Sequence, residues 1–337
     1  MLRLEGKNIE ELLKHQAQQQ TLPFDNESKI MIFNPDKMAF ARHETFALRY
    51  GWLSKGFQAM TKDSDIFESD EATVELGVGK NMVSAIKYWL RACRMIDPVK
   101  NKSTALGDYI LSSDDGYDPY LEDEATIWLL HWLLATNAEL ATSWFWFFNR
   151  FHKPEFTGQE LGTALVDFVY EKVINKKKPA LATLSNDAGL IPRMYTLSTG
   201  NTRTPLEDAL DSPFSLLKLV SQSAGGRSYQ SRPMARPDLP LGMLGFAVCE
   251  MFEMKNTRAI PIEDFMYSKD NYPAIGSVFR LTESDLVAKL ERLVNYIPGI
   301  FDIRDTAGQH QLYLSEETDA MIFIIEHYEN PSKEIAA

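Results

Sequence analysis

Only two of the 337 residues are cysteines, Cys93 and Cys249, and they stand far apart with no metal-ligand spacing. The sequence therefore indicates neither a disulfide framework nor a zinc site, and it fits the reducing cytoplasm. The first residues, MLRLEGKNIEELLKHQ, contain no uninterrupted apolar stretch, so we do not expect a secretory signal.

The chain also lacks a long apolar run free of polar side chains. Its most apolar stretch, residues 125–148, contains His131, Asn137 and Glu139, which a membrane span would tolerate poorly. With 45% apolar and 24% charged residues, the chain is long enough to bury a substantial core. We therefore expect this stretch to form buried helices of a globular protein without a membrane association.

Positive charge is in deficit, since the formal net charge is -12. This excludes a protein that coats nucleic acid with its whole surface. The charge is uneven, however. Residues 103–140 hold eight acidic residues and no Lys or Arg, whereas residues 212–237 hold four basic residues and no acid. A polyanionic partner would have to bind local basic patches.

Residues 42–112 predict a winged helix-turn-helix. We expect helices over 44–60, 70–76 and 80–95, followed by a wing with a polar tip at 100–103 and a returning strand at 109–111.

The expected fold class is mainly α with short β hairpins, that is, α+β. A helix over 241–253, a helix over 282–296 and a hairpin in IFDIRDTAGQHQLYL predict a second winged-helix-like module. The first 30 residues either pack on a partner subunit, which leaves a homodimer open, or cap their own domain. The expected division of the chain is a helical arm (1–30), the winged helix-turn-helix (31–112), a helical domain (113–200), an irregular basic linker (201–240) and the C-terminal module (241–337).

The segment ELGVGKNMV, residues 75–83, resembles a phosphate-binding loop at first sight. A Walker loop needs a glycine where Val74 stands and a hydroxyl residue where Asn81 stands. A tight interhelical turn explains the segment better, because Gly77 adopts the left-handed conformation easily. We therefore predict a turn and no nucleotide.

The helix after this turn has two distinct faces. Val83, Ile86, Leu90 and Cys93 recur at helical spacing and predict a buried stripe. The opposite face would enter a major groove with its N-terminal end near base edges and its C-terminal end near the backbone. The alternative is a solvated face of a scaffold that binds protein. The predicted DNA contacts are Lys80, Asn81, Ser84, Lys87, Arg91, Arg94, Lys100 and Lys102.

Candidate catalytic residues rest on chemistry alone, since no hydrolase motif occurs. His43 and Glu44 either cap a helix or supply a proton acceptor, and Arg49 either pairs with Glu44 or binds a phosphate. The acidic loop 114–124 is either solvated surface or a site for Mg²⁺ or Mn²⁺, as phosphodiester hydrolysis commonly needs. The candidate metal ligands are Asp115, Asp118 and Asp123.

Three segments, FARHETFALRYGWLSKGF, VELGVGKNMVSAIKYWLRA and DGYDPYLEDEATIWLLHWLL, resemble an uncharacterised-domain family of bacterial DNA phosphorothioation clusters. More narrowly, they resemble the DNA-nicking component of Ssp-type systems. The resemblance is strong over residues 33–150 and continues to about residue 315.

The resemblance implies a protein of DNA modification and antiphage defence that acts on double-stranded DNA. Its partners would be a cysteine desulfurase and a sulfur-transfer ATPase component, and it would nick one strand to allow sulfur incorporation. No family motif assigns a catalytic residue. A non-catalytic DNA-binding adaptor or transcriptional regulator is the alternative, so whether the chain is an enzyme stays open.

Overall fold

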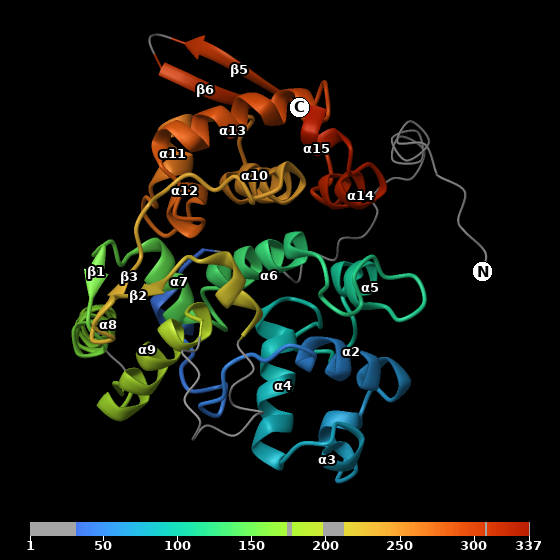
Figure 1. Ribbon diagram of the computed structural model, residues 1–337, viewed down its shortest axis with the longest axis vertical. Coiled ribbons are helices and arrows are strands. Elements are labelled where there is room, and N and C mark those ends of the chain that lie inside the picture. Colours follow the sequence, from blue (N-terminus) through green and yellow to red (C-terminus); the bar gives the residue numbers. More distant parts are fainter. Residues whose placement is uncertain (1–31, 174–176, 198–211, 307–308, 337) are drawn as a thin grey trace.

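The computed structural model describes residues 32–173, 177–197, 212–306 and 309–336, and its elements form two lobes (Figure 1). The N-terminal lobe holds α2 to α9 and a small sheet, and the C-terminal lobe holds α10 to α15 and a second sheet. The predicted arm, residues 1–30, lies outside the described residues, as do residues 201–211 of the predicted linker. The structure confirms a mainly helical α+β chain.

The N-terminal lobe begins with short 3-10 turns, η2 (Pro35–Lys37) and η3 (Ile66–Glu68), around the first long helix. This helix, α2 (Trp52–Lys62), starts eight residues later than the expected start at residue 44. The reason is the backbone before it: Glu44, Thr45 and Gly51 have φ of 50°, 65° and 73°, which a right-handed helix excludes. The expected helix start at Glu44 was therefore wrong.

Helices α3 (Ala72–Glu75) and α4 (Lys80–Ala92) flank a short turn, where the second and third helices of the helix-turn-helix were expected. The predicted returning strand of the wing was wrong, because residues 109–111 lie in the helix α5 (Ala105–Leu111). Thr104 caps that helix by accepting a hydrogen bond from the Gly107 amide at 3.0 Å. A single bridge between Ile96 and Ser103 closes the loop after α4.

The apolar stretch forms two helices, α6 (Glu124–Thr136) and α7 (Thr142–Asn149), and both are buried along nearly their whole length. This confirms the prediction of buried helices. None of the helices in the described part of the chain is both long and apolar enough to cross a bilayer. Two further helices, α8 (Gly158–Lys172) and α9 (Leu181–Tyr195), complete the lobe.

The basic segment 212–240 packs on the lobe. It contains η4 (Pro213–Leu217), β2 (Ser221–Gln222) and β3 (Tyr229–Gln230), and the strands join β1 (Glu155–Phe156) in the order β1-β3-β2. Two of its cations have partners within the protein: Arg232 pairs with Glu155 at 3.4 Å, and the buried Arg236 donates to the carbonyl of Lys218 at 3.3 Å. The segment is therefore held in place by internal contacts.

The C-terminal lobe contains the predicted helices α10 (Leu241–Lys255) and α13 (Glu283–Tyr296) and the predicted hairpin. The hairpin strands β5 (Phe301–Thr306) and β6 (Gln309–Leu314) pair antiparallel, and β4 (Ala259–Pro261) adds a third strand in the order β4-β6-β5. The other helices are α11 (Ile262–Met266), α12 (Ile275–Val278), α14 (Met321–Glu329) and α15 (Lys333–Ala336).

One hydrophobic core runs through both lobes, because α6 contacts α7 below and α10 above. Arg280, at the end of α12, ties the lobes together with polar contacts. Its guanidinium is buried and donates to the carbonyls of Phe147, Phe148 and Phe151. Burial lowers the pKa of Arg280 to about 9, and the carbonyl oxygens replace the water that it loses.

Candidate nucleic-acid interface

The turn between α3 and α4 is built around Gly77, whose φ is 62°. This left-handed conformation costs little for glycine, and it lets the chain reverse within four residues. Gly79 precedes α4 in an extended conformation with φ of -71°. The segment ELGVGKNMV is therefore an interhelical turn, as predicted.

Helix α4 buries the predicted apolar stripe, since Val83, Ile86, Leu90 and Cys93 are all inaccessible or nearly so. Three polar side chains at its N-terminal end are exposed: Lys80, Asn81 and Ser84. The helix N-terminus also carries the positive end of the helix dipole and unpaired amides. This end of α4 can therefore accept an anionic group together with hydrogen-bonding groups.

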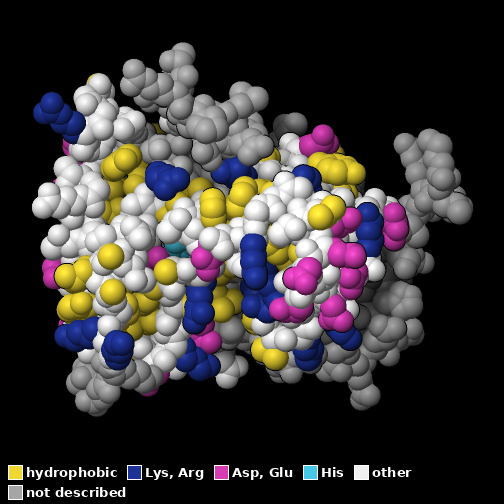
Figure 2. Space-filling model, turned by 90° about the horizontal axis from the view of Figure 1, so that it is seen from below, with side chains coloured by type: hydrophobic (Ala, Val, Ile, Leu, Met, Phe, Trp, Pro, Cys, Tyr) yellow, Lys and Arg dark blue, Asp and Glu magenta, His cyan; other side chains and the backbone are white. Residues whose placement is uncertain are grey.

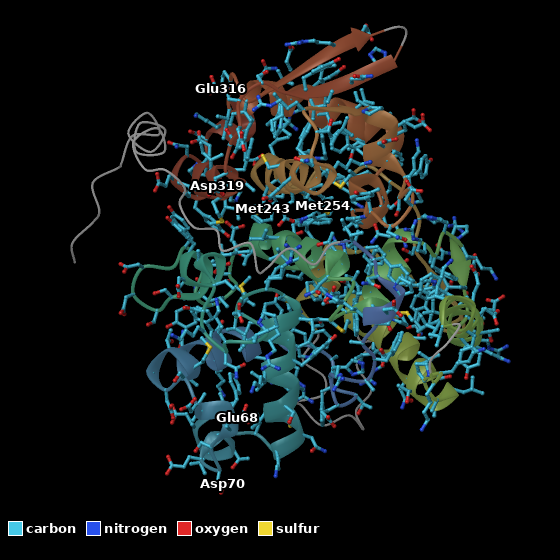
Figure 3. All side chains as sticks on the ribbon, turned by 180° about the vertical axis from the view of Figure 1, so that it is seen from behind. Glu68, Asp70, Met243, Met254, Glu316 and Asp319 are labelled. Atoms are coloured by element: carbon cyan, nitrogen blue, oxygen red, sulfur yellow. The ribbon has the colours of Figure 1, made fainter. Side chains whose placement is uncertain are left out.

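The cations in the middle of α4 are held by neighbouring side chains. Lys87 forms an ion pair with Glu68, and this hydrogen bond lowers the pKa of the Glu68 carboxyl. Arg91 donates from Nη2 to Oδ1 of Asn101 at 2.5 Å, and burial lowers the pKa of its guanidinium. Figure 3 shows Glu68 and Asp70 at the end of the molecule opposite the β5–β6 hairpin. Both cations are oriented before any ligand arrives.

Seen from below, the molecule presents Lys and Arg side chains near the centre of its face, with a group of Asp and Glu side chains beside them (Figure 2). The positive surface is therefore bounded by negative charge, and a polyanion could approach it only along a restricted path.

The loop after α4 presents two more lysines. Asp97 organises it by accepting hydrogen bonds from the amides of Val99 and Lys100, at 2.8 and 2.5 Å. The Asp97 amide donates to the carbonyl of Lys102 at 2.8 Å. Lys100 and Lys102 are exposed. The loop thus holds its lysines beside the C-terminal end of α4, where the wing was expected.

Arg94 does not lie on the exposed face of α4. It follows the last helical residue, Ala92, and its φ of 58° turns the chain away from the helix. Its guanidinium contacts Glu250 on α10 at 2.8 Å and the Thr136 hydroxyl at 2.6 Å. Helical spacing predicted Arg94 on the same helix face as the other DNA contacts, and that position was wrong because the helix ends at Ala92. Its contact with DNA stays a prediction.

His43 is buried behind α4 in a hydrogen-bonded network. Its Nδ1 accepts from the Thr45 amide at 3.1 Å, so its Nε2 carries the proton and donates to Asp187 at 3.0 Å. Asp187 also accepts from the Ser143 hydroxyl and the Ala41 amide, each at 2.9 Å. This pair connects residues 144 positions apart, and no local pattern could have revealed Asp187.

The other two candidates for catalysis have different surroundings. Glu44 is exposed in its left-handed turn, and the Arg49 guanidinium lies 5.3 Å from the centre of the Trp52 ring. The His43 ring thus contacts Asp187, whereas the Arg49 guanidinium contacts the Trp52 ring. The catalytic assignment of His43, Glu44 and Arg49 stays a prediction.

Two carboxylates of the acidic loop form hydrogen bonds within the protein. Asp118 is buried and accepts from the amides of Glu122 and Asp123, at 2.7 and 3.1 Å, and from the Thr126 hydroxyl. Asp123 caps α6 and contacts His327 at 3.5 Å. Within the described ranges, no three His, Cys, Asp or Glu side chains come close enough to bind one metal ion. Two of the predicted metal ligands, Asp118 and Asp123, thus already accept hydrogen bonds within the protein, and the assignment of Asp115, Asp118 and Asp123 to a metal stays a prediction.

The model of a family described as "Protein of unknown function (DUF4007)" matches residues 40–328. Two solved structures are similar in sequence and fold, one described as "SspB crystal structure" and one as "Magnesium ion-bound SspB crystal structure". Each is 30% identical to this chain, with TM-scores of 0.75 and 0.74. The alignments cover 89% and 88% of this chain and 90% of each SspB chain. No curated protein matches in sequence.

Proposed function

This chain belongs to the DUF4007 family, and from that premise we propose that it is the DNA-binding component of a bacterial DNA phosphorothioation and defence system. Its similarity to SspB confirms the family resemblance that the three sequence segments predicted. In this proposal the protein is cytoplasmic, works with a cysteine desulfurase and a sulfur-transfer ATPase component, and nicks one strand of duplex DNA to allow sulfur incorporation.

DNA binding is supported by a group of polar and basic side chains on α4 and the loop after it, which we call the α4 basic surface. Its side chains come from one helix and from the loop that a hydrogen bond between Arg91 and Asn101 joins to it. The surface consists of Lys80, Asn81, Ser84, Lys87, Arg91, Lys100 and Lys102.

The two ends of this surface suit different parts of a duplex. A helix of 13 residues is about 20 Å long, which suits a helix lying across a major groove. Asn81 and Ser84 supply uncharged hydrogen-bonding groups for base edges, whereas the loop lysines supply charge for the backbone. We therefore assign sequence reading to the N-terminal end of α4 and phosphate contact to the loop.

Nicking of one strand, with Mg²⁺ or Mn²⁺ as the metal, is the finer part of the proposal. A magnesium-bound SspB structure supports it, and a metal ion would stabilise the charge that develops on the phosphate. The described residues contain no group of three His, Cys, Asp or Glu side chains that could bind one metal ion, so we assign no residue and no step to the metal. The alternative function is a non-catalytic adaptor or regulator.

The α4 basic surface is tested by reversing its exposed charges. Lys80→Glu with Lys102→Glu should weaken duplex binding at low salt at least tenfold, because two attractive contacts become repulsive. Lys87→Glu with Arg91→Glu should abolish binding, although it also breaks the contacts with Glu68 and Asn101. The matched control is Lys172→Glu, an exposed lysine at the end of α8.

Binding is measured by fluorescence anisotropy of a labelled duplex, and folding of each variant by circular dichroism. Unchanged affinity of folded Lys80→Glu/Lys102→Glu protein would mean that α4 faces another kind of partner.

Nicking is tested with supercoiled plasmid in the presence of Mg²⁺ or Mn²⁺. Conversion to open circles supports the enzyme. Plasmid that stays supercoiled while the protein is demonstrably bound would establish the adaptor instead.

A further inference from the structure

The strand β5 is an edge of its sheet. The strand order β4-β6-β5 gives it a single neighbour among the described residues, and the hairpin forms one end of the molecule with β5 on its outer side (Figure 1). The carbonyl of Ile300 accepts from the Ser315 amide at 2.8 Å, so even-numbered residues direct their backbone groups toward β6. By alternation, Phe301, Ile303 and Asp305 direct theirs outward.

Outward backbone groups on an edge strand are a template for another strand. An antiparallel copy of β5 could pair with it in three ways around the strand centre, with the two-fold axis at residue 302, 303 or 304. In each of these registers, the outward N–H and C=O groups of one strand lie opposite the outward N–H and C=O groups of the other. Side-chain charge must therefore decide between them.

The charges of β5 favour one of these registers. With the axis at Ile303, Asp302 lies opposite Arg304 of the second copy, and the pair occurs twice. With the axis at Asp302 two aspartates would lie opposite each other, and with the axis at Arg304 two arginines would do so. Opposite charges directly across a strand pair stabilise it, and like charges destabilise it.

The side chains are available for such pairs. Asp302 and Arg304 now contact each other along the strand at 2.7 Å, with 47% and 56% of their side chains exposed. Such an exposed pair contributes little within one chain, so exchange of partners costs little. The Arg304 guanidinium also lies 4.6 Å from the centre of the Tyr313 ring, which keeps it on the outer face of the sheet.

The opposite face of the strand carries two apolar side chains, Phe301 and Ile303, and the exposed Asp305 toward its end. Phe301 is buried against Phe252 and Phe323, and Ile303 is half-buried beside the core. With the axis at Ile303, the two isoleucines lie side by side, and each covers the exposed part of the other. The outward backbone groups, the charges of Asp302 and Arg304, and the contact between the two isoleucines thus favour the same arrangement.

We propose that two copies of this chain associate through antiparallel pairing of their β5 strands, centred on Ile303, to form a six-stranded sheet across a two-fold axis. The strand is only six residues long, so the dimer is weak and depends on concentration. The proposal goes beyond the proposed function and is independent of it.

The test uses the full chain and charge swaps at β5. Arg304→Asp sets aspartate against Asp302 of the second copy, and Asp302→Arg sets arginine against Arg304. Each single variant should raise the dimer dissociation constant about tenfold in sedimentation equilibrium. The double variant Asp302→Arg/Arg304→Asp restores opposite charges and should return the constant to within about threefold of the wild type.

The control is Arg258→Asp, an exposed charge beside β4 at the other edge of the sheet, which should leave the dissociation constant unchanged. Thermal melting confirms that each variant is folded. A wild type that stays monomeric up to millimolar concentration would overturn the proposal. So would a dimer that both single variants leave intact, or single-variant losses that the double variant fails to reverse.

Discussion

Nη1 of Arg94 lies 2.8 Å from Oε1 of Glu250, across 156 positions of sequence and across the junction of the two lobes. The indole of Trp132 donates to the other oxygen of Glu250 at 2.5 Å. The side chains of Arg94 and Glu250 are 11% and 10% exposed, so each stabilises a charge that would otherwise be buried alone. The end of the α4 segment is thereby fastened to α10.

Arg94→Ala should lower the free energy of unfolding by about 3 kcal/mol, because Glu250 would keep a buried charge without its main partner. Urea denaturation followed by circular dichroism measures this. Lys80→Ala, at the exposed end of α4, is the control and should change stability by less than about 0.5 kcal/mol. An Arg94→Ala protein that is as stable as the wild type but fails to bind DNA would indicate that Arg94 contacts DNA.

His327 makes stability depend on pH. Burial by itself would lower its pKa, but hydrogen bonds to Asp123 and Glu334 outweigh burial and raise the pKa to about 9 from an ordinary value of 6.5. The stabilisation is therefore complete below about pH 6.5 and is lost as the pH rises to about 9, with a maximum of about 3 kcal/mol.

His327→Gln should flatten the dependence of stability on pH across this window. Thermal melts at half-unit steps from pH 6 to pH 9.5 measure it. His310→Gln, in the exposed hairpin, should leave the slope as it is in the wild type. A wild type whose stability does not fall between pH 6.5 and 9 would contradict the charged state of His327.

Lys100→Ala with Lys102→Ala should weaken duplex binding uniformly across DNA sequences. Loss of two phosphate contacts should also reduce the slope of log K against log salt concentration by about 2. Anisotropy titrations between 50 and 300 mM salt would give both quantities. Loss of affinity for some sequences only, with an unchanged slope, would show that these lysines contact bases.

Gly245→Ala should destabilise the protein by about 1–3 kcal/mol, because a methyl group there would overlap the Phe323 ring of α14. Gly189→Ala in α9 is a matched control, since open space surrounds that position. It should raise stability by about 0.5–1 kcal/mol through helix propensity. Denaturant midpoints of the two variants should therefore move in opposite directions.

Local patterns in the sequence predicted what depends on neighbouring residues. The turn at Gly77, the buried stripe of α4 and the β5–β6 hairpin all follow from spacing of three, four or two residues. The strand expected at 109–111 failed because a short apolar run fits either a strand or a helix, and the Thr104 cap decided for the helix.

Local patterns could not predict the contacts around the candidate site, because these contacts join residues far apart in the sequence. Asp187, Glu250 and His327 reach their partners across 144, 156 and 204 positions, and only the folded chain brings them there. The sequence shows an aspartate at position 118, but only the folded loop shows that its carboxylate accepts hydrogen bonds from two backbone amides. Charge placement along the chain thus identified candidate residues without their roles.

The helix-turn-helix shares its interior with the rest of the protein. Trp89 of α4 packs edge-on against Trp144 of α7, with ring centres 5.3 Å apart, and both are buried in the common core. Recombination that joined residues 32–112 of one family member to the remainder of another would bring together two surfaces that had not evolved against each other. If the family binds DNA as we propose, its DNA preference should diverge by substitutions at exposed positions such as Lys80, Asn81 and Ser84, and exchange of the whole segment should be rare.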